Sequence, residues 1–147
     1  LPSTQLREHL NMPALIQDRA TLRRPGEQIE PPVGANARIF AGALVAISAT
    51  GFAVAAAIGA TLKGAGVAER RADNTGGVDG AIRVRLSKTP HAFANSAAAD
   101  AITLADIGSD CYMVDDQTVA KTNGGGTRGR AGRIYDVDAD GVWVDFR

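Results

Sequence analysis

The chain has 147 residues, enough for one domain around one core, and its 16 basic and 16 acidic side chains leave it without net charge. Zero net charge argues against a dedicated nucleic-acid-binding protein, whose domain is usually basic. The single cysteine, Cys111, excludes an intramolecular disulfide, and its apolar neighbours predict a buried thiol.

Residues 1–36 differ in composition from the rest and predict an extended N-terminal arm. Four prolines, at positions 13, 25, 31 and 32, break any long helix. The segment is either a disordered tail or an arm that becomes ordered on a partner. In the second case the side chains that contact the partner are Arg7, Leu10, Met12, Leu15, Ile16, Arg19, Arg23 and Arg24. Arg and Glu interrupt the early apolar runs, so no signal peptide is predicted.

The stretch from Gly42 to Leu62 contains no charged residue, and its length would suffice for a membrane-spanning helix. Its composition argues against a span, because most of it is Ala, Gly, Ser and Thr and neither end carries Trp or Tyr. Residues 48–51 read Ser-Ala-Thr-Gly, a turn signal between two apolar runs. We therefore predict a hairpin of buried strands at 44–47 and 52–54, and no membrane partner.

Residues 37–147 predict one all-β domain, because short apolar runs alternate with turn signals along it. Ala94 to Gly108 is expected to be helical or connecting, with Ser96 as a helix cap and a short turn near residues 104–107. The expected strands lie at 64–70, 81–86, 111–114, 117–121, 131–137 and 142–146. This pattern is typical of an antiparallel β sandwich, a barrel or a jelly roll.

An internal repeat supports the strand assignment. A shift of 66 residues places Gly42 on Gly108 and Thr61 on Thr127, and it likewise matches the Ala-Gly pair at 65–66 with the pair at 131–132. Each unit predicts the order strand, tight turn, strand, loop, strand, although the spacing slips after residue 73. The second copy of the repeat carries several charges, so it is not a membrane helix. If the two copies share a fold, the first copy is not a membrane helix either.

The string DVDADG, residues 136–141, matches the first half of an EF-hand calcium loop. The second half does not match, because position twelve of that loop falls on Arg147 and both flanks are strand-like. We therefore predict a hairpin turn in which Asp-Gly supplies the positive φ.

The string GGGTRG, residues 124–129, has the spacing of a dinucleotide-binding glycine motif, but a strand follows it instead of a helix. A flexible hairpin loop is the better interpretation. Its Arg128 and Arg130 are candidates for contact with an acidic partner surface.

The remaining candidates predict neither an enzyme nor a cofactor or metal site. His9 and His91 are the two histidines, no cysteine lies near either of them, and no nucleophile-elbow pattern is present. Trp143 lies between two valines on a predicted strand, where it serves either the core or a partner interface.

Four blocks within residues 37–147 resemble a known family in their overall sequence pattern. They read AGALVAISATGFAVAA, GVAERRADNTGGVDGAIRVRL, FANSAAADAITLADIGSDCYMVDDQTVAKT and RAGRIYDVDADGVWVDF. These blocks resemble the small capsid decoration, or cement, proteins of tailed bacteriophages. The resemblance lies in overall texture and repeated blocks and includes no catalytic signature.

The resemblance implies a non-enzymatic structural virion protein with a jelly-roll-like or related β fold, assembled in the host cytoplasm. Its implied place is the outer capsid surface, and its implied partners are the phage major capsid protein and further copies of itself, as a homodimer in preference to a homotrimer. It implies no cofactor and no direct contact with nucleic acid. A tail or head-completion protein is the alternative within the virion; a small hydrolase or metal-dependent enzyme is the alternative outside it.

Overall fold

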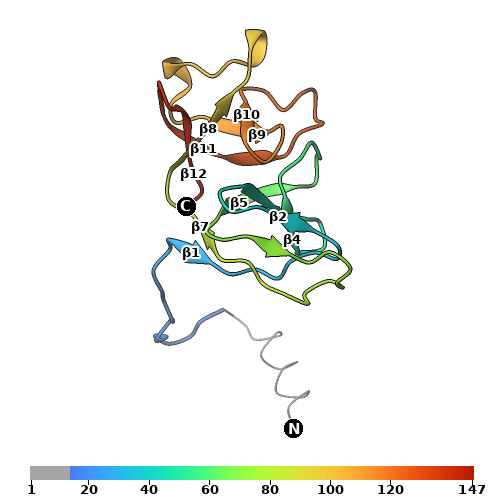
Figure 1. The fold of residues 1–147 in the computed structure, drawn as a ribbon. Helices are drawn as coiled ribbons and strands as arrows, with labels where there is room; N and C mark the ends of the chain where they lie inside the picture. The colour runs from blue at the N-terminus through green and yellow to red at the C-terminus, as the bar shows by residue number, and fades with distance from the viewer. Residues whose placement is uncertain (1–13) are drawn as a thin grey trace.

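The fold is described from a computed structural model, over residues 14–147 (Figure 1). Within this range the chain forms twelve β-strands and two short 3-10 helices. In chain order the elements are β1 (Gln28–Ile29), β2 (Arg38–Ile39), β3 (Leu44–Ile47), β4 (Ala53–Ala55), β5 (Lys63–Ala68), β6 (Ala72–Asp73), β7 (Leu86–Ser87), β8 (His91–Asn95), η1 (Ala98–Asp100), η2 (Leu104–Asp106), β9 (Asp110–Met113), β10 (Thr118–Ala120), β11 (Arg130–Asp138) and β12 (Gly141–Asp145).

The strands form two five-stranded assemblies. The first has the order β1-β7-β5-β3-β4, and the second is a closed barrel in the order β10-β8-β12-β11-β9; β2 and β6 make a small separate pair. Figure 1 shows the first assembly below the second, with the chain passing upward from β7 to β8. The predicted all-β class with antiparallel sheets is confirmed and the arrangement is sandwich-like, but a jelly roll in particular is not confirmed.

The predicted hairpin between residues 44 and 54 is confirmed, and its register repeats in the second assembly. Ala46 of β3 pairs with Val54 of β4, and Tyr112 of β9 pairs with Ala120 of β10. The second pair is the first one shifted by 66 residues. No helix in residues 14–147 is long and apolar enough to cross a membrane.

The third strand of each assembly repeats in the same way. Val45 pairs with Gly66 of β5, and Cys111 pairs with Gly132 of β11, again at an offset of 66. Both ladders then shift register at the same place, as a β-bulge does. The predicted internal repeat is therefore confirmed at the level of individual residue pairs.

The parallel pairing that closes the second assembly has a shorter counterpart in the first. In the second, β10 runs parallel to β8 with Val119 beside Asn95. In the first, a single parallel bridge joins Val33 to Ala53, which lies 66 residues before Val119. We call strands β1, β3, β4, β5 and β7 the first unit and strands β8 to β12 the second unit.

The β fold begins at Gln28, inside the segment 1–36 that the composition assigns to the arm. Gln28 and Ile29 pair with β7, and the side chain of Val33 is fully buried. Pro31 and Pro32 belong to this β structure as well, because their carbonyl oxygens accept hydrogen bonds from the N–H groups of Val84 and Ala53 and these bonds need no proline N–H.

Two other local expectations differ from the structure. Ser96 does not cap a helix, because its hydroxyl donates to the carbonyl of Val119, and η1 begins at Ala98. The expected turn near residues 104–107 is confirmed as η2. Residues 81–86 show the predicted alternation of burial, but only Leu86 of them lies in a named strand.

Two hydrophobic clusters fill the molecule, and β3 contributes to both. Val45 packs in the cluster inside the first unit, whereas Leu44 and Ala46 pack in the cluster that includes the interior of the second unit. Successive side chains of a strand point to opposite faces, so β3 is a wall between the two clusters. This burial on both faces explains why β3 carries no charged side chain.

The same face of the second unit is not covered. Leu44 pairs with Val67 in the first unit, and the equivalent pair in the second unit is Asp110 with Arg133. Both members of the charged pair are exposed, whereas both members of the apolar pair are buried. The two units therefore share a backbone plan and differ in what lies against this face.

The two units approach each other closely at glycines. A Cβ on Gly64 of β5 would overlap the carbonyl group of Ala131 in β11, and a Cβ on Gly129 would overlap the carbonyl oxygen of Leu62. Backbone is in both cases the obstacle, and backbone moves less easily than a flexible side chain. These glycines allow the contact between the units.

We expect Gly64→Ala to lower the free energy of unfolding by about 1–3 kcal/mol, as overpacking does in other cores. The measurement is urea denaturation followed by circular dichroism. Gly26→Ala is the matched control, since nothing lies within 4 Å of a Cβ at that position. An unchanged unfolding midpoint for Gly64→Ala would contradict the close contact of the two units.

Candidate partner-contact surface

The predicted contact residues fall into an N-terminal group and Trp143. Arg7, Leu10 and Met12 lie outside the described residues. The other members of the N-terminal group lie between Ala14 and Glu27, a segment that we call the arm; they are Leu15, Ile16, Arg19, Arg23 and Arg24, and all are exposed.

The apolar side chains of the arm lie open to solvent. Leu15 is 71% exposed and Ile16 is 93% exposed. Leu22, which the sequence analysis did not select, is 95% exposed. Its position beside Arg23 is the signal that would have found it, because the other anchors share the same mixture of apolar and basic residues.

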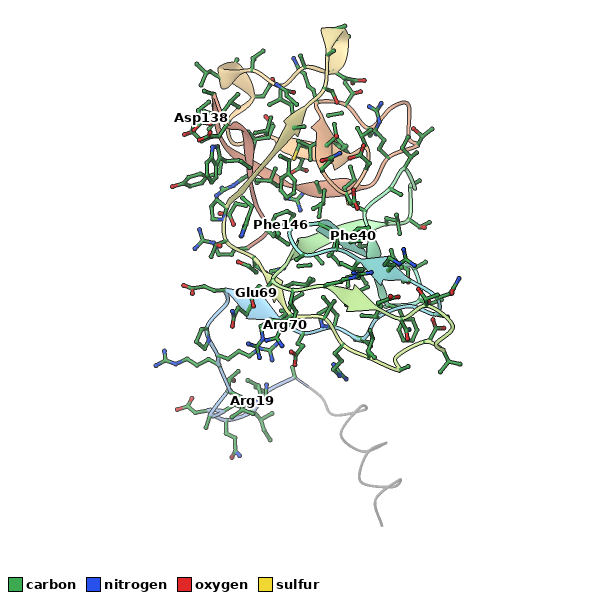
Figure 2. The ribbon with its side chains drawn as sticks, in the orientation of Figure 1. Arg19, Phe40, Glu69, Arg70, Asp138 and Phe146 are labelled. Atoms are coloured by element: carbon green, nitrogen blue, oxygen red, sulfur yellow. The ribbon has the colours of Figure 1, made fainter. Side chains whose placement is uncertain are left out.

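The arm is attached to the body at its C-terminal end. The N–H of Lys88 donates to the carbonyl oxygen of Glu27 at 2.8 Å, and β1 follows directly. Within the arm the only backbone hydrogen bond described runs from the N–H of Thr21 to the carbonyl of Arg19. Figure 2 shows Arg19 at the lower end of the molecule, away from both units. The described part of the arm therefore lies mostly in solvent.

Trp143 lies on β12 between the buried Val142 and Val144, and it belongs to neither core cluster. It pairs across the hairpin with Asp136, and its indole N–H donates to a carboxylate oxygen of Asp138 at 2.9 Å. The structure thus places Trp143 half-buried on the outer face of the hairpin, where part of its ring is accessible.

The DVDADG segment is the predicted hairpin turn between β11 and β12. Asp138 pairs with Gly141, whose φ is 126°, and the N–H of Asp140 donates to the Asp138 carboxylate at 2.9 Å. Among residues 14–147 no three His, Cys, Asp or Glu side chains are grouped to hold a metal ion. Hydrogen bonds of the turn and of Trp143 therefore engage the Asp138 carboxylate.

The two arginines of the glycine-rich loop are engaged inside the chain. Arg128 donates to the Asp100 carboxylate at 3.2 Å and to the carbonyl of Thr122 at 3.1 Å. Arg130 forms an ion pair of 2.8 Å with Asp110. Both arginines therefore have a carboxylate partner within the chain, and their contact with an acidic partner surface stays a prediction. The Thr122 hydroxyl also donates to the Asp100 carboxylate, and this hydrogen bond first and that of Arg128 second lower the pKa of Asp100.

A surface hollow of about 550 Å³ between η2 and β9 is lined by Asp106, Asp110, Tyr112 and Lys121, among others. The Asp106 carboxylate accepts hydrogen bonds from the backbone N–H and the hydroxyl of Thr103 and lies 3.6 Å from the Lys121 ammonium. The Thr103 bonds hold the pKa of Asp106 below its ordinary value. A carboxylate held ionised in this way is suited to fixing η2 and poorly suited to taking up a proton in catalysis.

Cys111 and His91, which the sequence analysis considered as possible reactive side chains, have structural surroundings. The Cys111 thiol is buried, and burial raises its pKa to about 12, so it remains protonated and unreactive near neutral pH. A ring nitrogen of His91 forms a hydrogen bond of 2.7 Å with the carbonyl of Thr89 at the start of β8.

Charged groups gather where the two units meet the C-terminus. Asp145 is buried, and Arg147 donates to it from its backbone N–H and from its guanidinium at 2.9–3.2 Å. These bonds lower the pKa of Asp145. The Lys88 ammonium donates to the carbonyl of Ala65, and burial lowers the pKa of Lys88. This cluster fixes the connection between the units.

Comparison of the chain with protein-family models, with curated proteins and with solved structures gave no significant match.

We expect Asp145→Asn to lower the free energy of unfolding at pH 7 by about 1.5–3 kcal/mol, because hydrogen bonds to a charged acceptor are lost. The folded-state pKa of Asp145 lies below the ordinary value of 3.8, so its contribution is present above that pH and is lost as the pH falls through the lowered pKa. Denaturation at several pH values measures both effects. Asp116→Asn, which removes a carboxylate without an ion pair among residues 14–147, is the control. Equal acid sensitivity of Asp145→Asn and wild type would contradict the assignment.

Proposed function

We propose that this chain is a structural virion protein that binds the outer surface of an icosahedral phage capsid. There it cements neighbouring major capsid protein subunits against the pressure of the packaged DNA. The observation that carries the proposal is the arm, which leaves the β body at Glu27 and presents Leu15, Ile16 and Leu22 to solvent. Exposed apolar anchors on an extended segment suit a binding partner that covers them.

The β body supports the same function. A five-stranded sheet and a closed five-stranded barrel are joined through one hydrophobic cluster that contains side chains of both, as suits a body that acts as a rigid clamp. Such a protein acts by binding and requires no cofactor, nucleic acid or membrane.

The stabilisation of the capsid shell would follow from mass action. A ligand that binds the assembled shell and not its separate subunits stabilises the shell by an amount that grows with its concentration. Symmetry repeats each weak contact many times over the shell, and association between copies raises the effective concentration at each site. The arm adds reach at an entropic cost that is met when it becomes ordered on a neighbouring subunit.

The test is co-sedimentation with empty capsids of the phage, before and after expansion. We expect the full chain to sediment with expanded capsids. A variant with Leu15, Ile16 and Leu22 all changed to Ser should lose at least tenfold in apparent affinity while its circular dichroism spectrum is unchanged, because burial of its anchors is the contribution removed. The matched control changes Ile58 and Val78 to Ser, since these side chains are also exposed and lie outside the arm.

Two results would contradict the proposal in different ways. If the full chain stays in the supernatant with expanded capsids, the capsid function is wrong. If the arm variant binds as tightly as the full chain, the capsid function stands and the role of the arm is wrong.

A further inference from the structure

The charge of this neutral chain is unevenly distributed. Residues 88–147 carry nine acidic and six basic side chains, whereas residues 1–87 carry seven acidic and ten basic ones. The second unit belongs to the acidic part, and the arm with the first unit belongs to the basic part. Figure 1 shows the described portions of these parts at opposite ends of the molecule.

The outer face of the β11–β12 hairpin combines carboxylates with an accessible aromatic ring. Asp136 lies directly across from Trp143, and Asp138 accepts the indole hydrogen bond. Tyr135 precedes them at the bulge of β11 and is 54% exposed. Asp140 at the turn is exposed as well. We call Tyr135, Asp136, Asp138, Asp140 and Trp143 the hairpin face.

No basic side chain of residues 14–147 forms an ion pair with the carboxylates of the hairpin face. Of the other acidic residues in 88–147, Asp100, Asp106, Asp110 and Asp145 have a basic partner within the chain, whereas Asp115 and Asp116 in the β9–β10 loop form no ion pair within residues 14–147. The hairpin face therefore holds three of the five carboxylates of residues 88–147 that lack an ion pair, and it combines them with the accessible rings of Tyr135 and Trp143.

The arm offers the complementary groups. Between residues 19 and 26 it carries Arg19, Arg23 and Arg24 and no acidic residue, and none of the three forms an ion pair within residues 14–147. A guanidinium pairs with carboxylates in a defined geometry and also stacks on an indole ring. Ile16 and Leu22 lie on either side of Arg19 in the chain and supply apolar area for the exposed aromatic rings.

We propose that the arm of one copy docks on the hairpin face of a second copy. Figure 2 shows Arg19 and Asp138 at opposite ends of one molecule, so the contact forms between molecules. Two copies side by side in antiparallel orientation bring each arm to the partner's hairpin face. A two-fold axis then makes the contact twice and closes the assembly as a homodimer.

This contact adds detail to the proposed function, because it identifies the neighbour of the arm as another copy of the chain. The use of the contact in the virion rests on the proposed function. Two arms hold the dimer together, so each contact raises the effective concentration of the other. Since exposed charges contribute, raising the salt concentration weakens the dimer.

The experiment is a charge exchange on the full-length protein, measured by sedimentation equilibrium without capsids. We expect wild type to dimerise, and both Arg19→Asp with Arg23→Asp and Asp136→Arg with Asp140→Arg to raise the dimer Kd at least tenfold. Mixing these two double variants gives a heterodimer with one wild-type contact and one charge-exchanged contact. Combining all four substitutions in one chain gives a homodimer with two charge-exchanged contacts. In both cases the Kd is expected to return to within about threefold of wild type. Asp138 is left unchanged, because it supports Trp143.

Arg70→Asp and Asp116→Arg are the controls, because they reverse charges outside the arm and the hairpin face in groups without an ion pair in residues 14–147. Both are expected to dimerise as wild type does. Circular dichroism of every variant checks the fold.

The inference is overturned by a monomeric wild type, by charge variants with the wild-type Kd, or by a mass that rises without limit as concentration rises. It is also overturned if the arm variant dimerises normally and loses only capsid binding, in which case the capsid protein is the neighbour of the arm and the proposed function stands. A charge-dependent dimer that does not sediment with capsids would support the inference and contradict the proposed function.

Discussion

The burial of β3 on both faces is the constraint around which the β body is arranged. Val45 points into one cluster, and Leu44 and Ala46 point into the other, so neither face has room for a charged side chain. An unpaired charge there would cost several kcal/mol or more in lost solvation. The uncharged stretch that resembles a membrane span in length is thus a hairpin whose first strand, β3, is enclosed on both faces, and β5 lies close against the second unit.

Much of the fold follows from local signals. The turn at residues 48–51 defines the hairpin, and the shift of 66 residues predicts equivalent strands that the pairing register confirms at Ala46 and Tyr112. The start of the fold could not be predicted in the same way. Val33 is buried because it lies beside Ala53, twenty residues later, and no local pattern in a proline-rich segment reveals such a partner.

The residues of the contact surface can likewise be divided into those that local sequence predicts and those that depend on distant partners. Composition alone selected the exposed anchors of the arm, since solvent exposure there requires no partner in the fold. The side chains whose partners lie far away in the chain were beyond its reach: Arg128 is held by Asp100, and Ser96 bonds to Val119. For Trp143 the alternation with two valines gives the face of the strand, but only the hairpin register places it against Asp136 and Asp138.

The pairing of Asp110 with Arg133 has a consequence for growth by stacking. In the first unit the matching positions hold Leu44 and Val67, and a neighbouring unit covers them. An equally apolar surface on the second unit would bind a further molecule, and repetition of that contact would form a fibre. The exposed charges of Asp110 and Arg133 oppose such stacking, because covering them would remove their hydration.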